Sequence, residues 1–400
     1  MTRRIYLDHN ATSPLRPEAK ASVVDCLDRV GNASSIHAEG RMARRQVEAA
    51  RENVAQLINA NPQNIIFTSG GTEANMMVLS PSVVLANRKT TEASVLPMKI
   101  FVSAIEHPCV LSGGRFDPSD VIKVPVTKSG TLDVQSLRHL LESHYGPKSD
   151  NSEPKPFTVS VMLANNETGA IQPISEISEI VRSYGGLLHT DAVQAAGKIP
   201  IDVETLGADF LTLSAHKIGG PQGVGALILC ADNLVLGPSL MRGGGQELKR
   251  RAGTENVAGL AGFGAATKAA HRDLADMARI AKLRHSLEQH LQNITPNLVI
   301  FAEDTERLAN TICLAAPGLS AEFLLIALDL EHISVSSGSA CSSGKVDRSH
   351  VLDAMAVPAD LGNGAIRISL GWNTSEQDIQ RFVQAWSKIY HNFKQKSMVA

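Results

Sequence analysis

The chain has 400 residues, of which 43% are hydrophobic and 20% charged, and its formal net charge is −2 at pH 7. This composition is typical of a globular protein long enough to form two lobes, and its near-neutral charge gives no field that would favour nucleic acid or an anionic membrane. The N-terminus lacks the apolar core of a signal peptide, and no run of about 18 apolar residues is present, so we expect a cytoplasmic protein.

The five cysteines are widely scattered and form no CxxC pair; they are Cys26, Cys109, Cys230, Cys313 and Cys341. Their odd number and spacing argue against a disulfide framework and against a local zinc site. We therefore expect a reducing compartment, in which any functional cysteine would act as a thiol.

From residue 15 the chain alternates between helical spacing of apolar residues and short apolar runs typical of buried strands. Strands are predicted at 64–68, 99–102, 121–126, 157–163, 187–190, 210–213 and 224–229, and helices between them include 132–145 and 174–184. Such alternation predicts a mainly parallel sheet between helices, with a ligand site beyond the strand ends.

The pattern changes near residue 262. A long helical stretch runs to residue 292, short strands are predicted at 311–315, 333–335 and 365–370, and a terminal helix begins at residue 375. We expect a large domain at 15–262 and a smaller α+β domain formed by 1–14 and 263–400. The irregular segments 79–99 and 146–156 are expected to lie away from the site.

A lysine at a strand end is the first candidate for chemistry. The stretch Ser214-Ala-His-Lys217 follows an apolar run and precedes a glycine-rich turn. A lysine buried there would have a lowered pKa and could act as a nucleophile. The alternative is an ordinary loop lysine, and this stretch by itself does not decide between them.

A second candidate is the turn Ser69-Gly-Gly-Thr-Glu-Ala-Asn75, which joins a predicted strand to a helix. Exposed backbone N–H groups and the helix dipole make such a turn a ready anion site, with Thr72 as a further donor. The turn matches neither GxGxxG nor GxxxxGK[ST], so it supports neither a dinucleotide site nor a P-loop.

Other polar residues also fall at the ends of predicted strands. The full set is Thr72, His107, Asn166, Asp191, Ser214, His216 and Lys217. Taken singly, an Asp after a strand is more often a helix cap and a His a satisfied polar residue. Taken together, they suit an aromatic aldehyde cofactor with a phosphate, which needs a lysine for a Schiff base and a carboxylate beside its ring nitrogen.

These motifs resemble those of the NifS/IscS-type cysteine desulfurases, which are pyridoxal-phosphate-dependent enzymes of fold type I. The resemblance covers nearly the whole chain. It is carried by 6–12 (YLDHNAT), 67–73 (FTSGGTE), 106–108 (EHP), 165–169 (NNETG), 189–194 (HTDAVQ), 216–217 (HK), 251–256 (RAGTEN), 336–344 (SSGSACSSG) and 366–370 (IRISL). It implies a large domain with a mainly parallel seven-stranded sheet between helices and a smaller α+β domain.

The resemblance also implies the cofactor pyridoxal 5'-phosphate. Lys217 resembles the lysine bonded to it, His107 the residue stacked on its ring and Asp191 the partner of its ring nitrogen. Gln194 and Asn166 resemble residues near its phenolic oxygen. The residues that resemble its phosphate ligands are Gly71, Thr72, Ser214 and His216.

Two further residues resemble binding groups of the family. Arg367 resembles the arginine that binds the substrate carboxylate, with Asn166 nearby, and its planar guanidinium suits bidentate binding. Thr254 resembles the threonine that reaches the cofactor phosphate of a partner subunit, which implies a homodimer with shared sites.

The stretch Ser336–Gly344 is rich in Ser, Gly and Ala, which predicts a mobile loop around Cys341. The alternative is a bland surface loop, but such loops tend to avoid an exposed thiol, and the family has its sulfur-accepting cysteine here. Since a free cysteine is only a few per cent thiolate at neutral pH, a lowered pKa or a base such as His107 would help. The other four cysteines are expected to be structural.

The implied reaction converts L-cysteine to L-alanine and leaves the sulfur on Cys341 as a persulfide. Acceptors implied by the family include iron–sulfur scaffold proteins, with nitrogenase maturation and tRNA thiolation as variants. No metal is expected in the resting enzyme, and Cys341 would contact an iron–sulfur cluster only transiently.

There are three rival functions. Selenocysteine lyase is the nearest, and another fold type I aminotransferase-like enzyme is disfavoured by the cysteine loop. A non-catalytic protein that had kept the fold would be expected to lack Lys217 or Asp191, and both are present.

Overall fold

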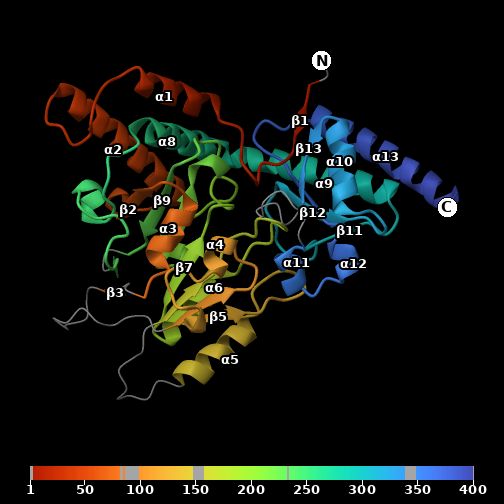
Figure 1. Ribbon diagram of the computed structural model, residues 1–400, viewed down its shortest axis with the longest axis horizontal. Coiled ribbons are helices and arrows are strands. Elements are labelled where there is room, and N and C mark those ends of the chain that lie inside the picture. The colour runs from red at the N-terminus through yellow and green to blue at the C-terminus, as the bar shows by residue number, and fades with distance from the viewer. Residues whose placement is uncertain are drawn as a thin grey trace.

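The computed structural model describes residues 3–81, 84–85, 99–146, 157–231, 234–337 and 348–399. Figure 1 shows a large lobe built from the first two thirds of the chain beside a smaller one that contains the C-terminus. Cys341 and most of the loop predicted around it lie outside the described residues, as do most of the two irregular segments. The first two residues of that predicted loop, Ser336 and Ser337, instead form a short strand.

The large lobe is organised around a seven-stranded sheet. In chain order its strands are β2 (Ile65–Thr68), β4 (Lys99–Ser103), β5 (Val121–Val124), β6 (Phe157–Ser160), β7 (Leu187–Asp191), β8 (Phe210–Ser214) and β9 (Gly225–Leu229). Their order across the sheet is β2-β9-β8-β7-β6-β4-β5. Strand β9 pairs antiparallel with both β2 and β8, and the other pairs are parallel, so the predicted mainly parallel, seven-stranded sheet is confirmed.

Helices cover this sheet because its central strands are buried along their whole length, as apolar runs in a parallel sheet require. They are α1 (Pro17–Leu27), α2 (Ala38–Ile58), α3 (Gly71–Val78), α4 (Pro108–Leu111), α5 (Val134–Tyr145), α6 (Ile174–Ser183), α7 (Val203–Leu206) and α8 (Val257–Arg272). Helix α5 begins where Asp133 accepts hydrogen bonds from two backbone N–H groups of its first turn. Two short strands, β3 (Val84–Leu85) and β10 (Leu234–Val235), pair at the edge of the lobe.

The small lobe has a four-stranded antiparallel sheet in the order β11 (Val299–Ile300), β12 (Thr311–Ala315), β15 (Ile366–Ser369) and β14 (Ser336–Ser337). Its helices are α9 (Met277–Ile294), α10 (Ala321–Leu330), α11 (His350–Ala354), α12 (Ala359–Gly362) and α13 (Glu376–Val399). Leu287, Phe382 and Trp386 belong to the core of this lobe.

The N-terminal residues join the small lobe. Strand β1 (Ile5–Tyr6) pairs in parallel with β13 (Ile333–Ser334), and Asp8 forms an isolated bridge with Ser369. The chain then crosses to α1 in the large lobe. Helix α8 spans the predicted domain boundary at residues 262 and 263, and its Phe263 and Ala266 lie in the core of the large lobe. The exact limits of the two domains, 15–262 and 1–14 with 263–400, stay a prediction.

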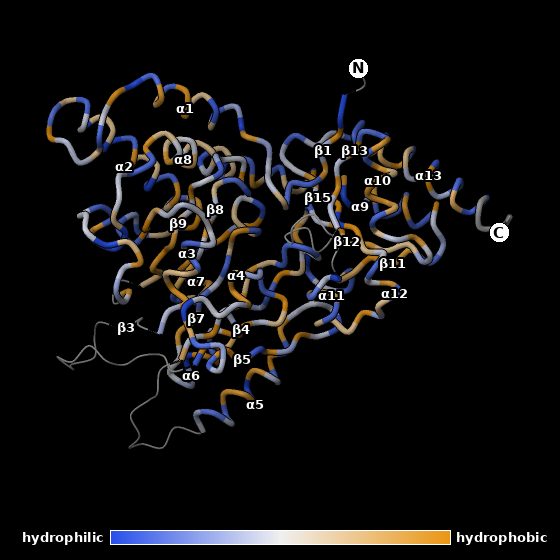
Figure 2. The backbone as a smooth tube through the Cα atoms, viewed as in Figure 1, coloured by the Kyte–Doolittle hydropathy of each residue, from blue (hydrophilic) through white to orange (hydrophobic). Residues whose placement is uncertain are grey.

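Figure 2 shows hydrophobic residues gathered along the strands and the inner faces of the helices, with hydrophilic residues on many outer turns. Within the described ranges, no helix combines the length and the apolar character needed to cross a membrane.

Candidate active site

A cavity of about 350 Å³ lies where the large sheet meets the small lobe. Most of the predicted site residues line it: Gly71, Thr72, His107, Asn166, Asp191, Gln194, Ser214, His216, Lys217 and Arg367. The cavity therefore brings together side chains from five separate segments of the large lobe and from β15 of the small one. Thr254 is exposed and does not line it.

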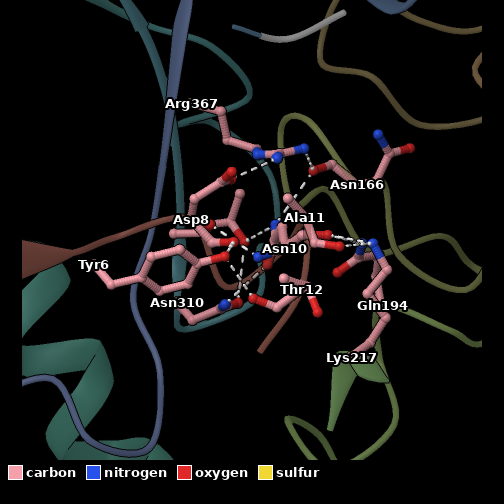
Figure 3. Close-up of polar contacts among 12 residues, drawn as sticks. Tyr6, Asp8, Asn10, Ala11, Thr12, Asn166, Gln194, Lys217, Asn310 and Arg367 are labelled. Atoms are coloured by element: carbon pink, nitrogen blue, oxygen red, sulfur yellow. Dashed lines mark hydrogen bonds and ion pairs between the residues drawn. The ribbon is translucent and has the colours of Figure 1, made fainter. Parts of the chain in front are cut away.

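Lys217 is held in a short helical turn, Ala215–Lys217, that directly follows β8. Gly219 lies two residues after this turn and has φ +82°, and a Cβ there would come within 2.6 Å of Arg16 Cγ. Glycine is thus required by both conformation and space. The Lys217 amine donates hydrogen bonds to the backbone oxygens of Asn10 at 2.5 Å and Ala11 at 2.8 Å, as Figure 3 shows.

Asp191 ends β7 and is only 8% exposed. Its Oδ2 accepts from Asn75 Nδ2 at 2.9 Å, and its Oδ1 accepts from the backbone N–H of Val193 at 2.9 Å. The carboxylate is thereby fixed against the cavity and can bind a protonated nitrogen there. The Oδ1 of Asn75 is buried and has no hydrogen-bond partner among the described residues.

The N-terminus of α3 borders one corner of the cavity through Gly71 and Thr72. A Cβ at Gly71 would lie 3.1 Å from Val193 Cγ2, so a larger residue would crowd this corner. Thr72, Ser214 and His216 border the same cavity. The pKa of His216 is lowered to about 4 by burial and by the nearby Lys217, so this histidine is neutral at pH 7 and can still donate an N–H.

His107 follows β4 and begins α4. Its Nδ1 accepts a hydrogen bond from the backbone N–H of Cys109 at 3.3 Å and lies 3.0 Å from the Cys109 sulfur. Burial lowers the pKa of His107, with a smaller contribution from Lys217. Burial also raises the pKa of Cys109 to about 11, so it is a thiol. We therefore assign the His107 proton to Nε2, because Nδ1 is the acceptor.

Arg367 lies on β15 and is 3% exposed. Its Nη2 pairs with Asp8 Oδ1 at 2.8 Å, and its Nη1 donates to the backbone oxygen of Asn166 at 3.0 Å. Its Nε has no hydrogen-bond partner among the described residues. The guanidinium is thus fixed by two neighbours and keeps N–H groups with which to bind a carboxylate.

Gln194 is buried and lines the cavity, and both the nitrogen and the oxygen of its amide are hydrogen-bonded. Its Nε2 donates to the backbone oxygen of Asn10 at 2.9 Å, and its Oε1 accepts from Lys198 Nζ at 3.0 Å. Burial, with the nearby Lys217 and Arg367, lowers the pKa of Lys198 to about 7. Because Lys198 donates to Oε1 and the Asn10 oxygen accepts from Nε2, these two neighbours fix the orientation of the Gln194 amide.

Several lining residues were not anticipated from the sequence, among them Asn10, Ala11, Asn75 and Cys109. Cys109 was expected to be structural, although its place two residues after His107 was a usable signal. Asn10 lies in the polar turn after the first strand, where nothing local indicates contact with Lys217. No group of three His, Cys, Asp or Glu side chains within the described ranges could hold a metal ion.

The sequence profile of the aminotransferase class-V family matches residues 5–382. The cysteine desulfurase IscS of Dictyoglomus turgidum is 37% identical over 98% of this chain and 96% of its own. A cysteine desulfurase of Cereibacter sphaeroides is 39% identical over 96% and 95%. The structure of a NifS-like protein from Rickettsia africae superposes with a TM-score of 0.84 at 36% identity, over 97% of this chain and all of that one.

The strand-end residues, the fold and these relatives agree with the resemblance found in the sequence. The chain belongs to the aminotransferase class-V family and, within it, to the cysteine desulfurases of the NifS/IscS type.

Proposed function

We propose that this cysteine desulfurase binds pyridoxal 5'-phosphate in the cavity, converts L-cysteine to L-alanine and collects the sulfur on Cys341. The observation that carries the proposal is that Lys217, Asp191 and Arg367 line one cavity. An amine, a carboxylate and a guanidinium there supply a group that can bond an aldehyde, a partner for a ring nitrogen and a carboxylate-binding group.

The donor set of the cavity fits this cofactor. The α3 N-terminus with Thr72, Ser214 and His216 would hold the phosphate, and the fixed Asp191 carboxylate would hold the protonated ring nitrogen. His107 would lie on the ring, and the buried Gln194 amide and Asn166 would lie near its phenolic oxygen. When bound, the cofactor supplies an electron sink for charge that develops at the substrate α-carbon.

The chain's own residues orient the substrate and move its proton. Arg367 would bind the carboxylate of L-cysteine with the N–H groups that Asp8 and Asn166 leave available. This contact places the α-carbon inside the cavity, where the Lys217 amine can accept the α-proton. His107, with its proton on Nε2, can donate a hydrogen bond from that atom but cannot accept a proton there until the tautomer changes.

Sulfur leaves the substrate through Cys341. The thiolate of Cys341 attacks the substrate sulfur, a new S–S bond forms and the C–S bond breaks, with its electron pair staying on carbon. Protonation of that carbon gives L-alanine, and Cys341 is left as a persulfide. The overall change is L-cysteine plus one enzyme thiol to L-alanine plus one enzyme persulfide, so no external oxidant is required.

The assembly and destination of the sulfur belong to the same proposal. The exposed Thr254 would reach the cofactor phosphate of a second copy, in a homodimer with shared sites. The persulfide would pass to an acceptor protein such as an iron–sulfur scaffold, in the cytoplasm. Names of the relatives as IscS support a role in iron–sulfur assembly.

The test is to compare the wild type with Cys341→Ala and, as a matched control, Cys26→Ala on helix α1. All three should bind the cofactor and show its absorption, and borohydride should fix it to the Lys217 peptide. Alanine and sulfide formation from L-cysteine should be lost only in Cys341→Ala. Full activity of that variant would exclude Cys341 as the sulfur acceptor, and absence of the cofactor from the Lys217 peptide would exclude the proposed site.

A further inference from the structure

The segment after β1 reaches from the small lobe to the Lys217 amine. Figure 3 shows Lys217 and Gln194 directed at the backbone of Asn10 and Ala11, while Arg367 lies toward the other side of this segment. The contacts are short, 2.5 Å to the Asn10 oxygen and 2.8 Å to the Ala11 oxygen. The amine thus meets two carbonyls that come from a distant part of the chain.

The position of the Asn10 carbonyl is fixed by the side chain of the same residue, which is 1% exposed. Its Nδ2 donates to Thr311 Oγ1 at 2.9 Å and to the Asn166 oxygen at 3.2 Å. Its Oδ1 accepts from Asn310 Nδ2 at 3.0 Å. A buried amide with all these contacts satisfied has one orientation, so its backbone cannot turn away from the cavity.

The backbone oxygen of Asn10 also contacts Gln194, a residue proposed to lie near the cofactor. The Asn10 carbonyl accepts from Gln194 Nε2 at 2.9 Å as well as from Lys217, and its two lone pairs accommodate both donors. Lys198 Nζ lies 3.4 Å from Asn10 Oδ1 and 3.0 Å from Gln194 Oε1. Asn10 therefore links the lysine amine to the amide expected near the cofactor's phenolic oxygen.

We propose that the carbonyls of Asn10 and Ala11 are the docking position of the Lys217 amine whenever it is not bonded to the cofactor, and that the Asn10 side chain is the positioning group that holds them there. The proposal rests on the proposed role of Lys217 as the lysine that bonds the cofactor. It assigns a role to a segment of the small lobe that lies outside the strand-end motifs.

Two carbonyls suit this task chemically. They accept hydrogen bonds from two N–H groups, so a neutral amine docked on them keeps its lone pair available to take a proton. An ammonium at the same place carries the added proton and can give it back. The same position therefore holds the amine before and after it accepts the α-proton, and the amine stays beside the substrate in both states.

The reactivity of Lys217 tests this directly. The full-length chain, with its cofactor removed, is treated with a limiting amount of an amine-acylating reagent, and the labelling rate of the Lys217 peptide is measured by mass spectrometry. In Asn10→Ala the rate should rise about fivefold, the factor expected for one lost hydrogen bond. Gln172→Ala is the matched control, because Gln172 is also a buried amide but hydrogen-bonds Leu132 and Gly130 and does not line the cavity. Its Lys217 labelling should match the wild type.

Equal labelling in the wild type and Asn10→Ala would overturn the docking position. Should Asn10→Ala fail to fold, Asn310→Ala removes a single anchor of Asn10 and should raise labelling by a smaller factor; wild-type labelling there would likewise overturn the proposal. Borohydride mapping of the cofactor-loaded chain reports separately on the proposed function. A cofactor fixed to another lysine would remove that function, while the labelling result would still report on the Asn10 contact.

Discussion

The two walls of the cavity are built in different ways. On the sheet side, Asp191 and Lys217 lie at or just after the carboxyl ends of neighbouring parallel strands, where topology alone places side chains together. On the small-lobe side, Asn10 and Arg367 are placed by hydrogen bonds to Thr311, Asp8 and the Asn166 backbone. Strand ends place the residues of the first wall side by side, and the second wall depends in addition on hydrogen bonds between distant segments.

This difference divides the chemistry as well. The sheet wall carries the groups proposed to hold the cofactor, and the small-lobe wall carries the groups proposed to bind the substrate carboxylate and to dock the amine. Changes in the sheet wall should therefore remove the reaction, whereas changes in the small-lobe wall should alter affinity or rate with the cofactor still bound.

The largest effect is expected for Lys217→Ala. Loss of the amine removes the proposed bond to the cofactor and the proposed proton acceptor, and loss of the proton acceptor alone accounts for a rate loss of about 10²–10⁴-fold. Alanine formation should fall at least that far, measured in single-turnover experiments with L-cysteine. Lys20→Ala on the exposed face of α1 is the control and should keep wild-type activity. A tenfold loss or less in Lys217→Ala would show that the sheet wall does not carry the chemistry.

Arg367→Gln should have a smaller effect, of a different kind. Removing a charged hydrogen-bonding partner of the substrate carboxylate costs about 1.5–3 kcal/mol, which raises the KM for L-cysteine about 10–150-fold. The absorption of the bound cofactor should be unchanged, because Arg367 belongs to the other wall. Arg381→Gln on α13 should leave the KM at its wild-type value. Loss of cofactor absorption in Arg367→Gln would contradict the division between the walls.

The contrast between the walls also explains what the sequence could predict. Strand β12 was predicted at its observed limits. Strand β5 ends at Val124, two residues before its predicted end, because Pro125 has no N–H to donate to a neighbouring strand. Strand ends located Asp191 and Lys217 from local pattern alone. Arg367 needed the family resemblance. Asn10 lies in the family motif at 6–12 but was not assigned to the site, because its contact with Thr311 joins residues 301 positions apart.

Asp8→Asn tests how the charge of Asp8 acts on Arg367 in the small-lobe wall. The Asn side chain keeps an oxygen for Arg367 but removes the negative charge that competes with a substrate carboxylate. The KM for L-cysteine should fall about fivefold, and inhibition by L-alanine should strengthen by a similar factor, the scale of one hydrogen bond. Steady-state kinetics with added L-alanine measures both. A KM that rises tenfold would mean that Asp8 mainly positions Arg367.

The remaining effect concerns stability rather than kinetics, at Lys198, where the walls meet. Its folded-state pKa is lowered to about 7 from an ordinary value of 10.5, chiefly by burial. Between these two values the unfolded chain binds more protons at this lysine, so its contribution to stability rises as pH increases from 7 to 10.5 and is smallest below pH 7. The slope is about 1.4 kcal/mol per pH unit for one proton. In Lys198→Met this contribution is absent.

The wild type should therefore gain stability over Lys198→Met between pH 7 and 9, measured by the midpoints of thermal unfolding, with Lys20→Met as the exposed control. Parallel pH dependence of the wild type and Lys198→Met would show that the Lys198 amine is hydrated in the folded protein, and that the walls do not close around it.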